Sequence, residues 1–359
     1  MQKQINKLDF TGTNIYSGID THKSQWTVTV MVENKPFKTF SQPSDPDVLY
    51  GYLKKNFPGA NYFTAYEAGF CGFWPHFKLK ELGVNSIVVN PSDIPTTDKE
   101  KRQKDDPRDS KKIARSLQNG ELKGIYVPER ETLEDRLLIR TRFTFVKELT
   151  RFKNRVKSLL NLHGITIPQE FGANRSYWSK RFILWLEGIK FDQPSATHAL
   201  RIIIEQCKHL RSNQLDITRN IRELSKTKRY FKNYNLLISI PGIGPTIAML
   251  LLTEIENIRR FQNLDQLCSF VGLVPSTRSS GEKERTGDIT TRGHKLLRRL
   301  LVEAAWVSIK SDPALMLSFV NYTSRMNPNK AIIRIAKKLL NRIRYVLLNE
   351  QEYVIALVQ

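Results

Sequence analysis

The order of short apolar runs in the N-terminal part restricts the folds open to this chain. Runs rich in β-branched and aromatic residues lie at 15–20, 26–32, 37–40, 62–66 and 86–90, and stretches with helical spacing lie at 47–56 and 73–82. A turn at 33–36 joins the second and third runs, and Gly83 closes the second helical stretch. The sequence therefore predicts a meander of three antiparallel strands, and later a strand, a helix and a strand.

This order is typical of a ribonuclease-H-like α/β domain, and acidic residues stand where its strands end. Asp20 ends the first strand and Glu67 follows the fourth. In such folds carboxylates at these positions converge on one end of the sheet, where they hold one or two Mg²⁺ ions through oxygen ligands. Two such ions stabilise both the attacking and the leaving oxygen of a phosphoryl transfer.

A second acidic pair lies at the start of a later helix. Pro107 suits a first helical turn, and helical spacing continues to Leu117. Asp106 and Asp109 are three residues apart and can therefore point the same way from this helix. Asp106 could instead be the N-cap of the helix, so the pattern leaves both roles open.

Net charge indicates the class of partner. The 359 residues include 57 Lys and Arg against 35 Asp and Glu, a formal net charge of +22, and the excess recurs along the chain. Such a surface favours a polyanion, whereas an acidic cluster within it would repel phosphate unless a divalent metal stood between them. The alternative is a soluble basic protein without such a partner. The length suggests two or three domains.

Cysteine usage and hydropathy indicate a cytoplasmic protein. Cys71, Cys207 and Cys268 are few, odd in number and far apart, which argues against a disulfide framework and a thiolate zinc site. The first thirteen residues lack the apolar core of a signal peptide, and the apolar run 247–252 is too short to span a bilayer. We therefore expect no membrane association.

The middle of the chain predicts a long helical hairpin. Apolar residues recur every three or four positions over 131–163 and again over 196–226, which suits a coiled-coil seam. The insert at 164–195 is rich in aromatic residues: Phe171, Tyr177, Trp178, Phe182 and Trp185. These rings could stack nucleobases, but packing within a small subdomain is the favoured interpretation.

Two glycines mark a tight turn in the C-terminal third. Gly242 and Gly244 lie in a Pro-Gly-Ile-Gly sequence between two helical runs. The turn is similar to the hairpin of helix-hairpin-helix modules, where glycines let backbone N–H groups approach a phosphate. A plain tight connection between helices explains the same residues equally well.

Basic residues accumulate on the helices that follow, at 294–309 and 331–347. A solvated face is the commonest meaning of such helices, but the net charge favours phosphate contact here. The candidate phosphate ligands are Arg285, Arg292, Lys295, Arg298, Arg299, Arg334 and Lys338. Between the turn and these helices lies a polar, charged stretch, 276–293, whose serines suit an ordinary loop by spacing alone.

Taken together, these residues resemble the DEDD transposases of bacterial insertion sequences, the bridge-RNA-guided recombinases that include pilin-gene invertases. The matching segments are Gly18–Asp20, Tyr66–Gly69, Val89–Pro91, Lys104–Asp109, Ile240–Gly244, Phe270–Pro275, Ser279–Gly281, Gly287–Gly293 and Leu297–Leu300. They follow the family's order over most of the chain. The aromatic insert has no counterpart that we can match.

The resemblance implies a domain plan and roles for particular residues. After a tail at 1–14 it implies a RuvC-like domain at 15–128, a coiled-coil region at 129–228 and a transposase domain at 229–359. Its acidic motif falls on Asp20, Glu67, Asp106 and Asp109 as Mg²⁺ ligands, although Asp105 adjoins the third. Its nucleophilic serine falls on Ser280, with Ser279 adjacent.

The implied reaction is strand exchange through a covalent phosphoserine, guided by a bridge RNA that pairs with target and donor DNA. Family members build composite sites from different subunits, so a dimer that assembles into a tetramer is expected. A Holliday-junction resolvase or another metal nuclease would use the same carboxylates with water as nucleophile. A nucleic-acid-binding protein with a decayed site would need neither.

Overall fold

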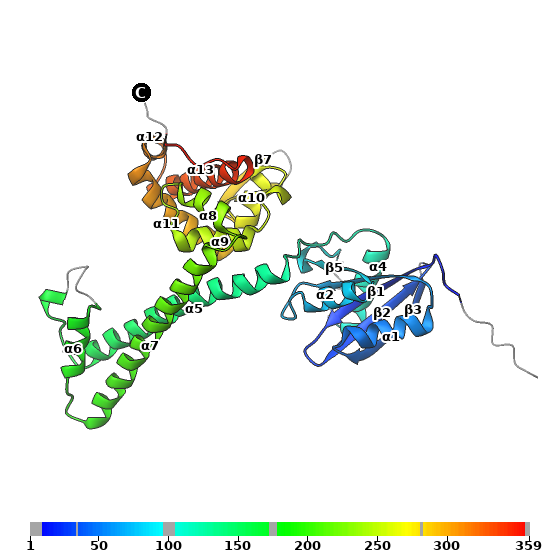
Figure 1. Cartoon of the computed structure of the whole chain (residues 1–359), viewed down its shortest axis with the longest axis horizontal. Coiled ribbons are helices and arrows are strands. Elements are labelled where there is room, and N and C mark those ends of the chain that lie inside the picture. Colours follow the sequence, from blue (N-terminus) through cyan, green and yellow to red (C-terminus); the bar gives the residue numbers. More distant parts are fainter. Residues whose placement is uncertain (1–8, 34, 96–104, 172–177, 281–282, 356–359) are drawn as a thin grey trace, which may run out of the picture. The chain divides into compact units, whose positions relative to one another are not determined.

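The computed structural model describes residues 9–33, 35–95, 105–171, 178–280 and 283–355. The chain divides into two compact units, Met1–Val127 and Pro128–Gln359. The first is a mixed α/β unit and the second is mostly helical (Figure 1). Each unit has hydrophobic cores of its own.

The first unit is built on a five-stranded sheet in the order β3-β2-β1-β4-β5. The strands are β1 (Asn14–Thr21), β2 (Gln25–Val32), β3 (Lys35–Pro43), β4 (Asn61–Glu67) and β5 (Asn85–Val89). The first three are antiparallel neighbours, whereas β4 pairs in parallel with both β1 and β5. The five predicted strands are confirmed, and this sheet is consistent with a RuvC-like domain.

Helices cover the sheet because its strands bury side chains on both faces. Ile15 and Ile19 of β1 enter a core with Leu49 and Leu53 of α1 (Pro46–Asn56) and Leu79 of α2 (Trp74–Glu81). The alternate residues of β1 point to the opposite face. There α4 (Asp106–Gln118) packs against β1 and β2.

Gly18 of β1 lets α4 approach the sheet closely. A Cβ on Gly18 would lie 2.2 Å from the carbonyl oxygen of Ser110 and 2.3 Å from the amide nitrogen of Ala114. In the sheet Gly18 pairs with Thr29 on one side and Ala65 on the other, so small side chains surround it. The hydroxyls of Thr29 and Ser110 share a hydrogen bond of 2.8 Å, which fixes the helix over this row.

The second unit begins with two long helices, α5 (Arg130–Leu162) and α7 (Pro194–Ser225). They pack against each other (Figure 1), and Arg142 Nε donates a hydrogen bond of 3.0 Å to Thr218 Oγ1 between them. Their bounds fall within two residues of the predicted helices. Whether their side chains interlock as a coiled coil stays a prediction.

The aromatic insert between these helices forms a small core with them. It contains a 3₁₀ turn at Gln169–Phe171 and α6 (Lys180–Gly188). Phe171, Trp178 and Phe182 are buried in one cluster with residues of α5 and α7 such as Val156 and Leu200. The packing interpretation is therefore confirmed for these three rings, while Tyr177 lies outside the described residues.

The rest of the second unit is a helical bundle around α9. Its helices are α8 (Phe231–Ile238), α9 (Pro245–Ile255), α10 (Leu264–Val271), α11 (Lys295–Ser311), α12 (Pro313–Thr323) and α13 (Pro328–Asn349). A short 3₁₀ turn lies at Ile258–Arg260, and the first unit has another at Pro91–Asp93. Ala248–Ile255 is buried throughout: apolar side chains lie on several sides of α9, and Thr253 and Glu254 are buried among them.

The polar stretch before α11 differs from the predicted loop. It forms a hairpin of β6 (Pro275–Ser280) and β7 (Lys283–Ile289), which pair antiparallel. The strand signal was hidden because polar and charged residues occupy nearly all positions of both strands, and the alternation of apolar residues that marks a half-buried strand is missing from their sequence. Among the described residues, no helix has the length and apolar character needed to cross a membrane.

Candidate active site

The acidic residues of β1 and β4 lie at the same end of the sheet. The two strands are parallel neighbours, and the last pair in their register is Ile19 with Tyr66, immediately before Asp20 and Glu67. Each acid is also two residues beyond a member of the Gly18–Ala65 pair that faces α4. Because side chains alternate along a strand, both carboxylates belong to the α4 face.

The start of α4 brings the second acidic pair to this face. Asp105 is the N-cap and Asp106 is the first helical residue, so Asp106 is not the cap that the sequence left open. Pro107 occupies the first turn, as predicted. Asp109 follows one turn later, and its carboxylate accepts a hydrogen bond of 3.1 Å from Lys112.

A histidine that the sequence did not single out joins two of these acids. His22 Nε2 lies 3.5 Å from Asp20 Oδ2 and 3.2 Å from Asp106 Oδ2. One ligand atom from each of these three residues lies within 4.8 Å of the others. The signal was the spacing Asp20-x-His22, since residues two apart share one side of an extended chain. Glu67 and Asp109 lie outside this group of three.

Electrostatics at this group favour a cation. Burial raises the pKa of Asp20 above its ordinary value; Asp106 and Asp109 raise it further, while His22 opposes them. A divalent ion would relieve this repulsion, and carboxylate oxygens with one imidazole are an acceptable ligand set for it. The residues present therefore fit a bound divalent metal.

The predicted serine lies in the second unit, at the end of β6. Ser280 pairs with Lys283 and Ser279 with Glu284, next to the turn of the hairpin. Arg285 lies in β7, opposite Arg278. The register of the two strands thus places both serines at the far end of the hairpin from Gly272 and Gly293.

Two glycines and one arginine hold the base of this hairpin. A Cβ on Gly293 would lie 2.6 Å from Gly272 Cα, so the two backbones cross where any side chain would collide. One guanidinium nitrogen of Arg298, Nη1, donates to the carbonyls of Gly272, Thr290 and Arg292. Arg298 was predicted to contact phosphate, and this contact stays a prediction; Nη1 is already bonded to the three carbonyls.

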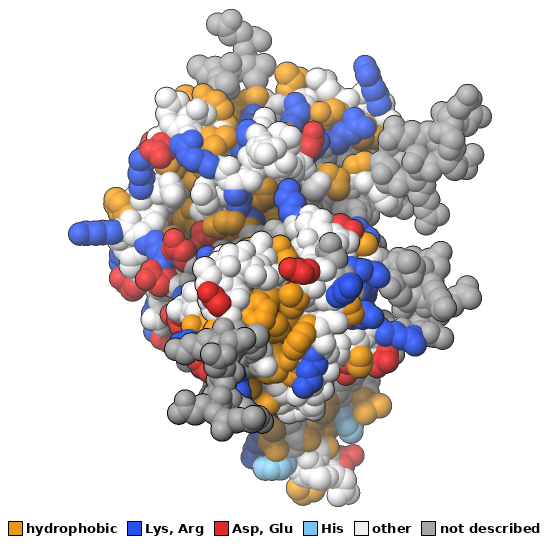
Figure 2. Space-filling model, turned by 90° about the vertical axis from the view of Figure 1, so that its right-hand side faces the viewer, with side chains coloured by type: hydrophobic (Ala, Val, Ile, Leu, Met, Phe, Trp, Pro, Cys, Tyr) orange, Lys and Arg blue, Asp and Glu red, His pale blue; other side chains and the backbone are white. Residues whose placement is uncertain are grey.

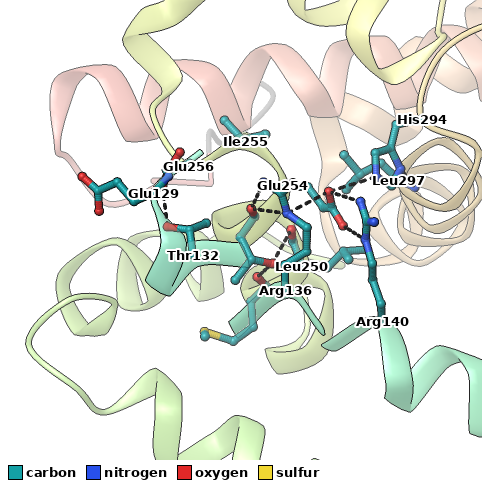
Figure 3. A network of polar contacts seen from close by, with 12 residues as sticks. Glu129, Thr132, Arg136, Arg140, Leu250, Glu254, Ile255, Glu256, His294 and Leu297 are labelled. Atoms are coloured by element: carbon teal, nitrogen blue, oxygen red, sulfur yellow. Dashed lines mark hydrogen bonds and ion pairs between the residues drawn. The ribbon is translucent and has the colours of Figure 1, made fainter. Parts of the chain in front are cut away.

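In the same unit, Glu254 of α9 contacts residues of α5 and the N-cap of α11 (Figure 3). Its side chain is 2% exposed, and it accepts bidentate hydrogen bonds of 2.7 and 2.8 Å from Arg140 of α5. Arg136 lies 3.3 Å away and His294 3.1 Å away. Burial alone would raise the pKa of Glu254, but hydrogen bonds from His294 and Arg140 outweigh it and hold the pKa at about 2.

His294 is the histidine nearest to Ser280 in sequence, and its ring nitrogens are both engaged. Nδ1 accepts a hydrogen bond of 3.1 Å from the amide of Leu297, which caps α11. Nε2 faces Glu254 at 3.1 Å. His294 therefore has no ring nitrogen available as a general base, and its role is to join α11 to Glu254.

The glycine turn before α9 is explained by packing at one of its two positions. Gly242 has φ +88°, and a Cβ there would lie 2.3 Å from Ser308 Oγ and 2.6 Å from the carbonyl oxygen of Ala304, both on α11. The Ser308 hydroxyl also donates to the Pro241 carbonyl at 2.7 Å. The approach that requires Gly242 is thus to α11. Gly244 is the N-cap of α9 and faces open space.

The other basic candidates differ in their surroundings. Arg292, Lys295, Arg334 and Lys338 are exposed, and no carboxylate partner is found for them within the described part of the chain. Arg299 lies 3.7 Å from Glu303, one turn away. Lys and Arg side chains are spread over the face drawn in Figure 2, among acidic and hydrophobic ones, as their distribution along the sequence suggests.

Comparison with known proteins finds two family models that match this chain. The model of the DEDD transposase domain of IS110-type elements matches residues 17–165, and that of the "Transposase IS116/IS110/IS902 family" matches residues 234–320. The chain belongs to the IS110 family of insertion-sequence transposases. Both the acidic motif and the serine hairpin fall within the matched segments.

Curated relatives agree with the two domain models. A putative transposase of Sinorhizobium fredii is 32% identical over 68% of this chain and 58% of its own length. A second one from the same organism is 26% identical over 91% of this chain and 90% of its own length. The transposase of insertion sequence element IS1111A of Coxiella burnetii is 26% identical over 76% of this chain and 74% of its own length.

Proposed function

We propose that this protein cuts and rejoins DNA strands during transposition, using Asp20, Glu67, Asp106 and Asp109 with a divalent metal and Ser280 as nucleophile. The observation that carries the proposal is the meeting of Asp20 and Asp106 at the edge where α4 packs on β1. The net charge of +22 attracts a polyanion such as DNA. A metal ion held by the carboxylates would then lie next to a phosphodiester on which it can act.

Asp20 and Asp106 would hold the ion. Glu67 lies at the same end of the sheet as Asp20, and Asp109 lies three residues after Asp106 on α4, so these two carboxylates would complete its ligand set. Mg²⁺ is the ion we infer, and when bound it polarises the scissile phosphate and neutralises developing charge. His22 Nε2 lies within 3.5 Å of a carboxylate oxygen of each of the two aspartates. The Lys112–Asp109 pair holds the second α4 acid in place.

The serine step balances without an external energy source. The Ser280 oxygen forms a bond to phosphorus, the phosphodiester bond to one DNA end breaks, and the hydroxyl proton passes to the departing strand's oxygen. A hydroxyl on a second DNA end then attacks the phosphoserine and releases Ser280. The bond energy is conserved throughout, so cleavage leads to exchange.

We further propose that a bridge RNA supplies sequence recognition by pairing with target and donor DNA, as the family resemblance implies. Protein contacts to phosphate, through residues such as Arg292, Lys295 and Gly244, would then position the strands without reading them. The serine and the acids lie in different compact units. A site that combines Ser280 of one subunit with the acids of another requires a dimer or tetramer, and this chemistry on DNA would take place in the cytoplasm.

The deciding experiment looks for a covalent adduct. Full-length protein, its RNA, Mg²⁺ and end-labelled DNA are mixed, denatured and separated on a gel, and the modified peptide is identified by mass spectrometry. We expect an adduct on Ser280 that Ser280→Ala abolishes, whereas the matched variant Ser279→Ala retains it. Asp20→Asn should abolish both adduct and cleavage, since the metal would lose a central ligand.

A metal nuclease with water as nucleophile is the second candidate. It shares the acidic residues, so only the serine separates the two. Cleavage by the wild type without any protein–DNA adduct, together with full cleavage by Ser280→Ala, would establish the nuclease and overturn the serine mechanism. Intact recombination by Asp20→Asn and Glu67→Gln would exclude both.

A further inference from the structure

The cations of α13 fall into two groups according to their partners. Three are engaged by the protein: Lys337 with Asp265 at 3.0 Å, Arg342 with the buried Asp312, and Arg344 with the Gln262 carbonyl at 3.0 Å. Lys330, Arg334 and Lys338 are exposed and have no carboxylate partner within the described residues. The uncompensated charge of this helix thus lies on three residues spaced four apart, of which Arg334 and Lys338 share a further feature.

These two charges stand over one aromatic ring. The Arg334 guanidinium lies 5.4 Å and the Lys338 ammonium 5.9 Å from the ring centroid of Tyr322 on α12. Both distances are within the range of a cation–π interaction. A ring that contacts both side chains limits their motion, so less conformational entropy remains to be lost when an anion binds.

The same residues line a hollow between α10, α12 and α13, which we call the Tyr322 groove. Its lining residues are Leu264, Tyr322, Arg334, Lys337, Lys338 and Asn341, and they enclose about 340 Å³. Arg334, Lys338 and Asn341 follow one another at spacings of four and three, so they form one stripe along α13. The groove is therefore positive, concave and partly aromatic.

We propose that the Tyr322 groove binds the sugar–phosphate backbone of a nucleic-acid strand, with phosphate oxygens on Arg334 and Lys338. Two cations without a counter-charge favour an anionic ligand, and a guanidinium can bind phosphate through two parallel hydrogen bonds. The Asn341 amide can donate and accept, and Leu264 and the Tyr322 ring offer apolar surface for a sugar or base. This site deepens the proposed function, on which it rests.

The test measures binding of the full-length chain to fluorescent RNA and DNA strands, single and double, over a series of salt concentrations. The Arg334→Gln/Lys338→Gln double variant should lose about tenfold in affinity at low salt, and its slope of log K against log salt should fall by about two, one for each phosphate contact. Comparison of the probes shows whether the strand is RNA or DNA.

A matched control separates local contact from net charge. Lys226→Gln/Lys232→Gln removes the same charge from surface lysines that are already paired with Glu223 and Glu350. Its affinity and salt slope should stay close to those of the wild type. Tyr322→Phe should behave as the wild type, whereas Tyr322→Leu should weaken binding about threefold, because it removes the ring under the two cations.

The outcomes distinguish this inference from the proposed function. If the wild type binds nucleic acid but both double variants lose affinity equally, the groove is not a contact and the proposed function stands. If the groove variant instead loses binding to an acidic peptide and keeps that to every nucleic-acid probe, the inference is also wrong. Failure of the wild type to bind any probe would refute the proposed function itself.

Discussion

At the scale of single residues, small side chains and glycines decide where the functional groups lie. Gly18 sets the distance between α4 and β1, and with it the position of Asp106 and Asp109 relative to Asp20. Gly272 and Gly293 likewise let two backbone segments approach closely at the base of the hairpin that carries Ser280.

Gly18→Ala should destabilise the first unit and weaken metal binding together. The added methyl would meet the backbone of Ser110 and Ala114 at 2.2 and 2.3 Å, and overpacking of this kind costs about 1–3 kcal/mol. Urea unfolding and Mn²⁺ titration measure the two effects. Gly51→Ala is the control: it lies within α1 with nothing within 4 Å, so we expect about 0.5–1 kcal/mol of stabilisation and unchanged metal affinity.

Arg298→Gln should separate hairpin order from DNA affinity. Loss of the guanidinium removes donors to three carbonyls, about 1.5–3 kcal/mol of charged hydrogen bonding at the base of the hairpin. Amide exchange at Thr290 and His294 should accelerate and adduct formation fall, with DNA affinity unchanged. The exposed Lys295→Gln should show the opposite pattern. Weaker DNA binding by Arg298→Gln at native exchange rates would restore its role as a phosphate ligand.

At the scale of elements, local patterns predict helices and strands well because their causes are local. Three local features each reflect contacts within a few residues: the apolar runs of β1, β2 and β4, the Pro107 start of α4, and the apolar spacing of α5 and α7. The β6–β7 hairpin was missed because polar and charged residues occupy nearly all positions of its two strands. Arg298 and Arg299 are neighbours of the same residue type, so the sequence cannot tell which of them points to the base of the hairpin. Only the packing of α11 shows that Arg298 does and that Arg299 is exposed.

The candidate site was predicted in outline and not in its details. Asp20, Glu67, Asp106 and Asp109 follow from strand ends and a helix start, and those elements exist. The contact of His22 with two of the acids depends on the approach of α4 across the sheet, a tertiary event with no local signature. The close approach at Gly18 is likewise visible only once helix and strand are packed.

The Glu254 network predicts how the junction of α5, α9 and α11 responds to acid. The pKa of Glu254 is lowered to about 2, so its contribution to folding is complete above its unfolded pKa of about 4.5 and is lost as the pH falls toward 2. The shift corresponds to about 3 kcal/mol. Urea unfolding of the wild type and Glu254→Gln should therefore differ most at pH 7, and the difference should shrink below pH 4.5. A difference independent of pH would contradict an ionised Glu254.

At the scale of the whole molecule, the two compact units should unfold in separable steps. Their hydrophobic clusters do not share residues: those of the first unit lie before residue 128 and those of the second after it. Calorimetry of the full chain should show two transitions. Gly18→Ala should lower only one, and Glu254→Gln only the other. A single transition that both variants shift equally would indicate a cooperative core that joins the units.

The division at Val127 and Pro128 also bears on how such elements could exchange parts. A crossover between two related genes at this point would join one parent's acidic unit to the other parent's serine unit without cutting through a hydrophobic cluster. Both halves of the chimera would inherit complete interiors. On the proposed function, gene shuffling could thus pair an existing metal centre with a new nucleic-acid-binding half in one event.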